Sequence, residues 1–244
     1  MRQQVAAATN SMALLAATAC GDVTGIRIPL PVPVVQVLLV SGKSVQEAQI
    51  EYSAPADSVV ARKPRPISPD SVSLMLTGPD SVPAPFSPKA GSPGRFIALH
   101  SIVPGVRYRL SGSVAGHAVS GAVTVPGALL VREPAADTLR LSASLPTQQV
   151  RFAASSFGAR AYIVRGRRRS GPDSFEAIRD TAGFFHPMPL YANRADTVHL
   201  SFEAYDVHAA EAFLPFTSIG NLHGVLGAIG ASVRASHSVI LVWQ

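Results

Sequence analysis

Four side chains able to bind a metal or move protons lie close together near the C-terminal end: His199, Glu203, Asp206 and His208. If this segment is a strand, His199 and Glu203 share one face at a separation of about 13 Å, while Asp206 and His208 point to the other. Zinc ligands must converge within about 2 Å of the metal, so this strand supplies at most half a site. We therefore expect no metal and no cofactor here, and we interpret the histidines as half-buried or exposed strand residues.

Catalysis by a nucleophile or by paired carboxylates has no recognisable sequence support. The chain lacks a Gly-x-Ser-x-Gly elbow, and Glu203, Asp206 and Glu211 have no distinctive context as a carboxylate pair. The glycine-rich residues 220–230 lack the Gly-Lys-Ser/Thr of a phosphate-binding loop. We predict no catalytic residues and a protein that is not an enzyme. The alternative is an envelope hydrolase.

The sharpest charged feature is a run of four arginines around Gly166, namely Arg165, Arg167, Arg168 and Arg169. At the tip of a hairpin with a loop over residues 165–173, they would bind phosphates of lipopolysaccharide, an anionic glycan or an acidic partner. The alternative is a solvated loop that discourages edge-to-edge aggregation. The net charge of +6 is too dispersed for a nucleic-acid footprint, so nucleic acid is not an expected partner.

Aromatic side chains gather in the C-terminal half of the chain. Tyr191, Tyr205 and Phe216 are the residues that we expect to line a ligand groove, if there is one, between two β domains.

The N-terminus is typical of a targeting segment. Arg2 is followed by a mostly apolar run over residues 5–19, too short to span a bilayer, and then by Cys20, the single cysteine. Small residues before a unique cysteine resemble the lipobox of bacterial lipoproteins. We predict a lipoprotein signal peptide over residues 1–19, lipidation of Cys20 and a lipidated tether over residues 20–33. The alternative is an ordinary secretory signal.

The elements that position these side chains are short strands. Residues 103–126 show two alternating apolar arms around Gly116-His117, the pattern of a β-hairpin. Residues 34–40 form a nearly continuous apolar run, which indicates a strand buried on both sides. Frequent turns and little helical periodicity predict an all-β protein. We place an immunoglobulin-like or transthyretin-like β-sandwich at residues 34–127 and a second antiparallel β domain at residues 128–244. A single elongated sandwich is the alternative.

Several of these segments resemble a family of envelope lipoproteins known as domain of unknown function 4249. The resemblance is carried by Cys20 and by loose motifs over residues 34–37, 69–74, 93–96, 104–110, 116–126 and 218–228. It implies an immunoglobulin-like or carboxypeptidase-regulatory-like first domain and an outer-membrane setting, often beside TonB-dependent receptors. It implies no known activity.

These observations together predict an exported protein, lipid-anchored at the outer membrane on its periplasmic or surface face. We expect a non-catalytic accessory or binding component of an envelope transport or glycan-handling assembly. The alternative within the binding class is a module that recognises glycan or lipopolysaccharide directly.

Overall fold

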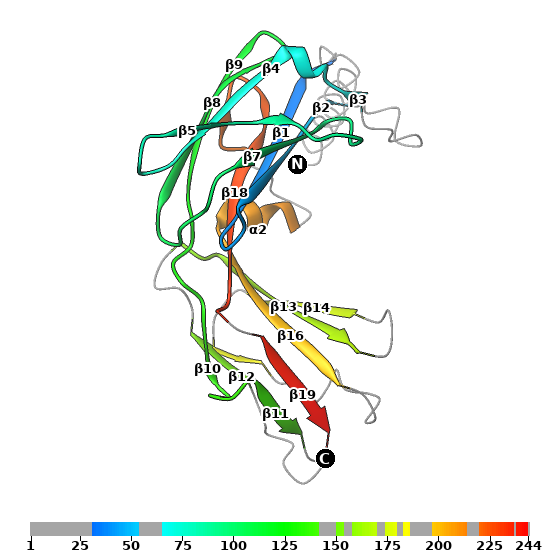
Figure 1. The fold of residues 1–244 in the computed structure, drawn as a ribbon, viewed down its shortest axis with the longest axis vertical. Coiled ribbons are helices and arrows are strands. Elements are labelled where there is room, and N and C mark those ends of the chain that lie inside the picture. The colour runs from blue at the N-terminus through cyan, green and yellow to red at the C-terminus, as the bar shows by residue number, and fades with distance from the viewer. Residues whose placement is uncertain are drawn as a thin grey trace, which may run out of the picture. The chain divides into compact units, whose positions relative to one another are not determined.

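The β-hairpin predicted over residues 103–126 is present in the computed structural model (Figure 1). The model describes residues 31–53, 65–141, 150–153, 158–169, 174–179, 183–185, 197–213, 220–236 and 238–243. Strands β8 (Arg107–Val114) and β9 (His117–Thr124) pair antiparallel around Ala115 and Gly116. Both turn residues have positive φ, 50° and 82°, as a two-residue hairpin turn that matches strand twist requires.

This hairpin is the middle of the first of two packed sheets. The sheet has the order β17-β9-β8-β4-β5. Its remaining members are β4 (Val72–Thr77), β5 (Pro83–Pro85) and β17 (Leu222–His223), and the short 3-10 helix η3 (Pro69–Ser71) precedes β4.

The facing sheet is built on β1 (Pro33–Val40), β2 (Val45–Tyr52) and β7 (Arg95–Leu99), with β3 (Arg65–Pro66) and β6 (Ser87–Pro88) at its margin. Alternate residues of both sheets, such as Val35, Ile50 and Leu110, form one buried core. The hydroxyl of Tyr108 accepts a hydrogen bond from Val103 N at 2.9 Å, the corner contact typical of immunoglobulin-like sandwiches. With the β1-β2-β7 and β5-β4-β8-β9 strand orders, this makes residues 33–53 and 65–124 an immunoglobulin-like β-sandwich.

The expectation that the first strand is buried on both sides is wrong. Val35, Val37 and Leu39 face the core, but Gln36 is exposed and Leu38 is half-buried on the other face. Leu38 packs there against a small separate apolar cluster, which explains why an apolar residue occupies that face.

The second part of the chain repeats the two-sheet arrangement. One sheet has the order β10-β12-β15. The other consists of neighbouring strands in the order β14-β13-β16-β19-β11, and these strands belong to the same sheet as β1, β2 and β7. Buried residues of both sets, among them Val131, Val150 and Phe202, belong to the common core. The bounds are β10 (Leu130–Glu133), β11 (Thr138–Leu141), β12 (Val150–Ala153), β13 (Ala161–Arg168), β14 (Ser174–Arg179), β15 (Gly183–Phe185), β16 (Val198–Tyr205) and β19 (Val239–Trp243). The predicted all-β class is confirmed.

The segment between β16 and β19 connects the first sandwich with the second part of the chain. Residues 206–236, which we call the return arm, include α2 (Val207–Phe213), β17 and β18 (Leu226–Arg234). Strand β17 pairs with β9, and β18 pairs parallel with β1, so one edge of each sheet of the first sandwich receives a strand from the arm. The return arm lies after the domain boundary predicted between residues 127 and 128, yet its strands pair with strands before that boundary. One sheet therefore runs from β6 in the first part of the chain to β11 in the second. The described residues from Val32 onward belong to one compact unit.

Candidate functional site

The arginine run does not sit together at a hairpin tip. The expected hairpin exists as β13 and β14, but Arg165, Arg167 and Arg168 lie within β13 and only Arg169 follows it. Side chains alternate along a strand, so Arg165 and Arg167 share one face while Gly166 and Arg168 take the other. Gly166 is buried, which shows that the second face is turned inward at that point.

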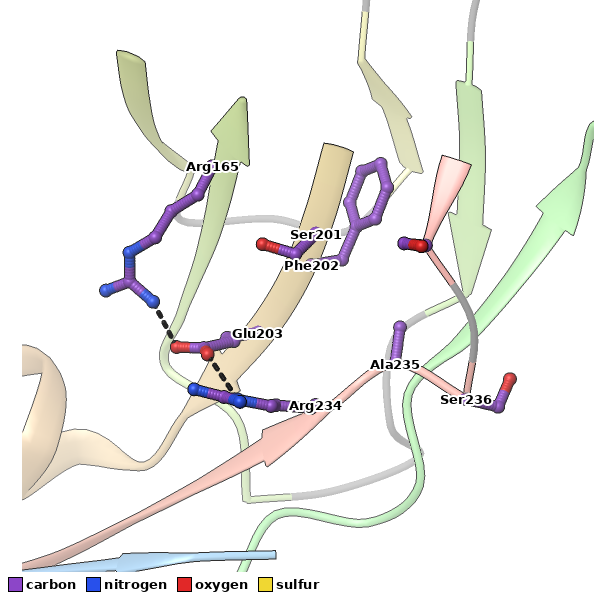
Figure 2. A pocket seen from close by; sticks show the side chains of 8 residues that line it. Arg165, Ser201, Phe202, Glu203, Arg234, Ala235 and Ser236 are labelled. Carbon is purple, nitrogen blue, oxygen red and sulfur yellow. Dashed lines mark hydrogen bonds and ion pairs between the residues drawn. The ribbon is translucent and has the colours of Figure 1, made fainter. Parts of the chain in front are cut away.

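Glu203 is the centre of a polar network of two arginines and a tyrosine (Figure 2). Its Oε2 accepts hydrogen bonds from Arg165 Nη1 and from the hydroxyl of Tyr205. Its Oε1 accepts a hydrogen bond from Arg234 Nε at 2.7 Å. Arg165 Nη2 also donates to the hydroxyl of Tyr205 at 3.1 Å. Glu203 is only 5% exposed, so these bonds replace the water that a carboxylate needs.

Strand register explains why these groups meet. In the ladder of β16 with β13, Ser201 lies opposite Arg165 and Glu203 opposite Ile163. In the short ladder of β16 with β18, Glu203 lies opposite Arg234. Glu203 therefore has one arginine directly across on one neighbouring strand and another on the diagonal of the other strand.

The network fixes the charge state of its members. Burial raises the pKa of Glu203, but the hydrogen bond from Tyr205 and the charge of Arg165 outweigh it, so the pKa is lowered. Burial and the bond to Glu203 raise the pKa of Tyr205 to about 12. At neutral pH the site therefore holds one carboxylate, two guanidinium groups and a neutral phenol, with an excess of one positive charge.

A hollow of about 440 Å³ opens over this network (Figure 2). It is lined by Arg165, Ser201, Phe202, Glu203, Arg234, Ala235, Ser236 and Ser238. The side chain of Arg234 is 53% exposed, and only its Nε is engaged within the described residues. Its two Nη groups, together with the hydroxyl of Ser201, can therefore donate to an oxygen-rich ligand. We call this the Arg234 hollow.

A second hollow, of about 490 Å³, lies where the first sandwich meets residues 158–160 and the start of the return arm. Its lining is Arg107, Ala122, Val123, Thr124, Gly158, Ala159, Arg160, Asp206, Val207 and His208. We call it the Arg107 hollow.

Asp206 and His208 are not strand residues, contrary to the expectation for this segment. Strand β16 ends at Tyr205, and Asp206 precedes α2. Asp206 Oδ1 accepts hydrogen bonds from Ala209 N at 2.9 Å and Ala231 N at 2.8 Å, as a helix-capping carboxylate does. Burial raises its pKa, although these backbone donors oppose the shift. No group of three His, Cys, Asp or Glu suited to a metal occurs among the residues that the structure describes.

The three residues expected to line a groove are not gathered by the described structure. Tyr191 and Phe216 lie outside the described residues, as does Cys20. Tyr205 is buried, and its hydroxyl serves the Glu203 network. Sequence reasoning missed Arg234, because nothing local to it indicates that β18 returns beside β16.

Comparisons with known proteins return structural similarity only. No family model matches the chain, and no curated protein matches it. A two-domain fibronectin type III segment of chicken tenascin is 13% identical with a TM-score of 0.23, covering 70% of this chain and 88% of its own. The FN1–FN3 domains of chicken CNTN1 are 11% identical with a TM-score of 0.22, covering 85% and 67%. The fold assignment rests on the strand order and the Tyr108 corner described above.

Proposed function

We propose that this chain is a non-catalytic binding protein of the cell envelope, lipid-anchored through Cys20, that recognises an anionic glycan such as lipopolysaccharide. The observation that carries the binding role is the Arg234 hollow, in which a guanidinium with free donors lies beside serine hydroxyls above the Glu203 network. The leader ending at Cys20 and the resemblance to envelope lipoproteins support the setting. No helix of the described residues is long and apolar enough to cross a bilayer.

The geometry of the Arg234 hollow favours recognition of sugar-borne anions. Arg234 can present two parallel N–H donors to a phosphate or carboxylate, and charge-assisted pairs of this kind are the strong ones. Ser201, Ser236 and Ser238 line the same hollow and add hydroxyl groups suited to sugar oxygens. Glu203 holds Arg234 through Nε, which leaves the Nη edge oriented before any ligand arrives.

Glu203 in the Arg234 hollow and Asp206 in the Arg107 hollow are both occupied in ways that do not suit acid–base work. A glycosidase needs two carboxyl groups that face one another across the scissile bond. Glu203 is bonded to Arg165, Arg234 and Tyr205, and its lowered pKa keeps it from donating a proton at neutral pH. Asp206 Oδ1 is taken by backbone N–H groups. These contacts support a binding role over the hydrolase alternative.

The test is retention of the full-length chain, purified in detergent, on immobilised lipopolysaccharide. We expect salt-sensitive retention that Arg234→Ser reduces at least fivefold. The matched control is Arg95→Ser, since Arg95 is another strand arginine close to a glutamate but lies in β7, away from the hollow. Equal retention of wild type and Arg234→Ser, or an equal loss in Arg95→Ser, would remove the proposal.

A further inference from the structure

The Arg107 hollow holds cationic side chains that no carboxylate neutralises. Arg107 is at the start of β8 and Arg160 just precedes β13, and both are exposed. Neither guanidinium makes an ion pair or hydrogen bond within the part of the chain described. The one carboxylate in the lining, Asp206, is buried and accepts three backbone N–H groups instead.

Uncommitted hydrogen-bonding groups surround these two arginines. Thr124 lies directly opposite Arg107 in the β8–β9 ladder, so its hydroxyl shares the face of that arginine. His208 also lines the hollow, and its Nδ1 is a buried nitrogen with no hydrogen-bond partner among the described residues. Because His208 Nδ1 is closed off from solvent, the groups that a ligand in the hollow can reach are the hydroxyl of Thr124 and the two guanidinium groups.

The two arginines come from different parts of the fold. Arg107 belongs to the first sandwich, whereas the backbone N of Arg160 donates to Tyr205 O at 2.7 Å in the second. Residues 158–160 lie against the end of the first sandwich, because a Cβ built on Gly158 would be 3.7 Å from Cα of Pro126. A ligand held by both arginines would therefore bridge the two sandwiches.

We infer that the Arg107 hollow is a second binding site, which takes the tetrahedral oxyanion of a phosphate or sulfate monoester. Arg107 and Arg160 each supply planar paired donors that match such oxygens, and Thr124 adds a hydroxyl. A doubly charged group is favoured over a single carboxylate because two free guanidinium charges face it. The site is separate from the Arg234 hollow, so it can fail while the proposed function of that hollow holds.

The experiment titrates the full-length chain, purified in detergent, with inorganic phosphate and then sulfate, followed by amide and histidine-ring NMR. We expect saturable shifts of Thr124, Arg160 and the His208 ring. We expect Arg107→Ser combined with Arg160→Ser to weaken binding at least tenfold. Arg109→Ser is the matched control, because Arg109 is an exposed arginine on the same strand that does not line the hollow. A melting temperature that rises with phosphate in wild type, but not in the double variant, is the expected second readout.

Two further titrations identify the kind of molecule that carries the phosphate. Glucose 1-phosphate represents a sugar phosphate, and dihexanoyl phosphatidic acid represents a lipid phosphate. If either compound binds more tightly than inorganic phosphate, the site is supported and the class of its ligand, sugar phosphate or lipid phosphate, is identified. No saturable shifts with phosphate or sulfate, unchanged binding in the folded double variant, or an equal loss in Arg109→Ser would overturn the inference. Circular dichroism establishes that the variants are folded, and both exchanged arginines are surface residues.

Discussion

Asp206 and Ala231 exchange a pair of hydrogen bonds across the return arm. Asp206 N donates to Ala231 O at 3.0 Å, and Asp206 Oδ1 accepts from Ala231 N at 2.8 Å. Asp206 is the first residue of the arm and Ala231 lies in the middle of β18, which pairs with β1 of the first sandwich. One aspartate therefore fixes the point where the arm leaves β16 and the strand by which it returns.

Removing this aspartate is expected to loosen the arm. Asp206→Ala leaves the N–H groups of Ala231 and Ala209 without their acceptor, and buried donors left unsatisfied cost about 1–3 kcal/mol each. We expect a loss of about 3 kcal/mol in the free energy of unfolding, measured by urea denaturation. Asp206→Asn keeps an acceptor oxygen and should lose roughly half of that or less. Equal losses in the two variants would contradict the capping role.

The Glu203 network predicts a specific pH dependence. The pKa of Glu203 is lowered in the folded state, so its contribution is fully present above the unfolded value, near 4.5, and is lost as pH falls through the folded pKa. We expect Glu203→Gln to be less stable than wild type by about 1–2 kcal/mol at pH 7, because Arg165 and Arg234 lose their anion while solvent still reaches both side chains. The difference should shrink below about pH 4.5, in urea midpoints measured from pH 7 to 3. A difference independent of pH would show that Glu203 is not held as an anion.

Gly227 is a glycine that the pairing of β18 with β1 requires. Its φ is +122°, and a Cβ there would lie 1.8 Å from Val35 O. Because both the backbone conformation and the space exclude a side chain, Gly227→Ala should destabilise the protein by about 3 kcal/mol or more, with faster amide exchange in β1 and β18. Gly91→Ala is the control, since Gly91 also has positive φ, +69°, but no atom lies within 4 Å of its Cβ position. It should lose about 1 kcal/mol. If Gly227→Ala and Gly91→Ala lose equal amounts of stability, the close approach of Gly227 to Val35 O does not contribute to the loss.

The proposed lipidation of Cys20 is tested in cells. Cys20→Ala should move the protein from the membrane fraction to the soluble fraction, because the two acyl chains that provide stable attachment are lost. Globomycin should retard the mobility of wild type and leave that of Cys20→Ala unchanged. An unchanged membrane fraction in the variant would favour the ordinary secretory signal.

Local pattern was enough to predict β1 and the β8–β9 hairpin of the first sandwich. Alternation over residues 103–126 places both arms of the β8–β9 hairpin, and the apolar run over residues 34–40 forms β1. Such patterns report only which residues face a core, not which strand lies alongside. The parallel pairing of Val34 with Leu226 joins the two ends of the described chain, and no local residue pattern encodes it.

The candidate site was predictable only in part for the same reason. The arginine run drew attention to Arg165, and the strand period correctly places His199 and Glu203 on one face of β16. Arg234 completes the network from β18, whose position depends on the return arm. The arginines were expected in a loop over residues 165–173, but Gly166 lies opposite Leu200 and Phe175 within the ladders.

The most direct test of recognition at the Arg234 hollow maps where an anionic glycan binds. A heparin-derived tetrasaccharide is titrated into the isotope-labelled full-length chain, and amide shifts are followed by NMR. We predict saturable shifts concentrated at Ser201, Arg234, Ala235 and Ser236, which Arg234→Ser abolishes while the spectrum stays folded. Shifts spread evenly over the exposed arginines, or none at this hollow, would contradict the account.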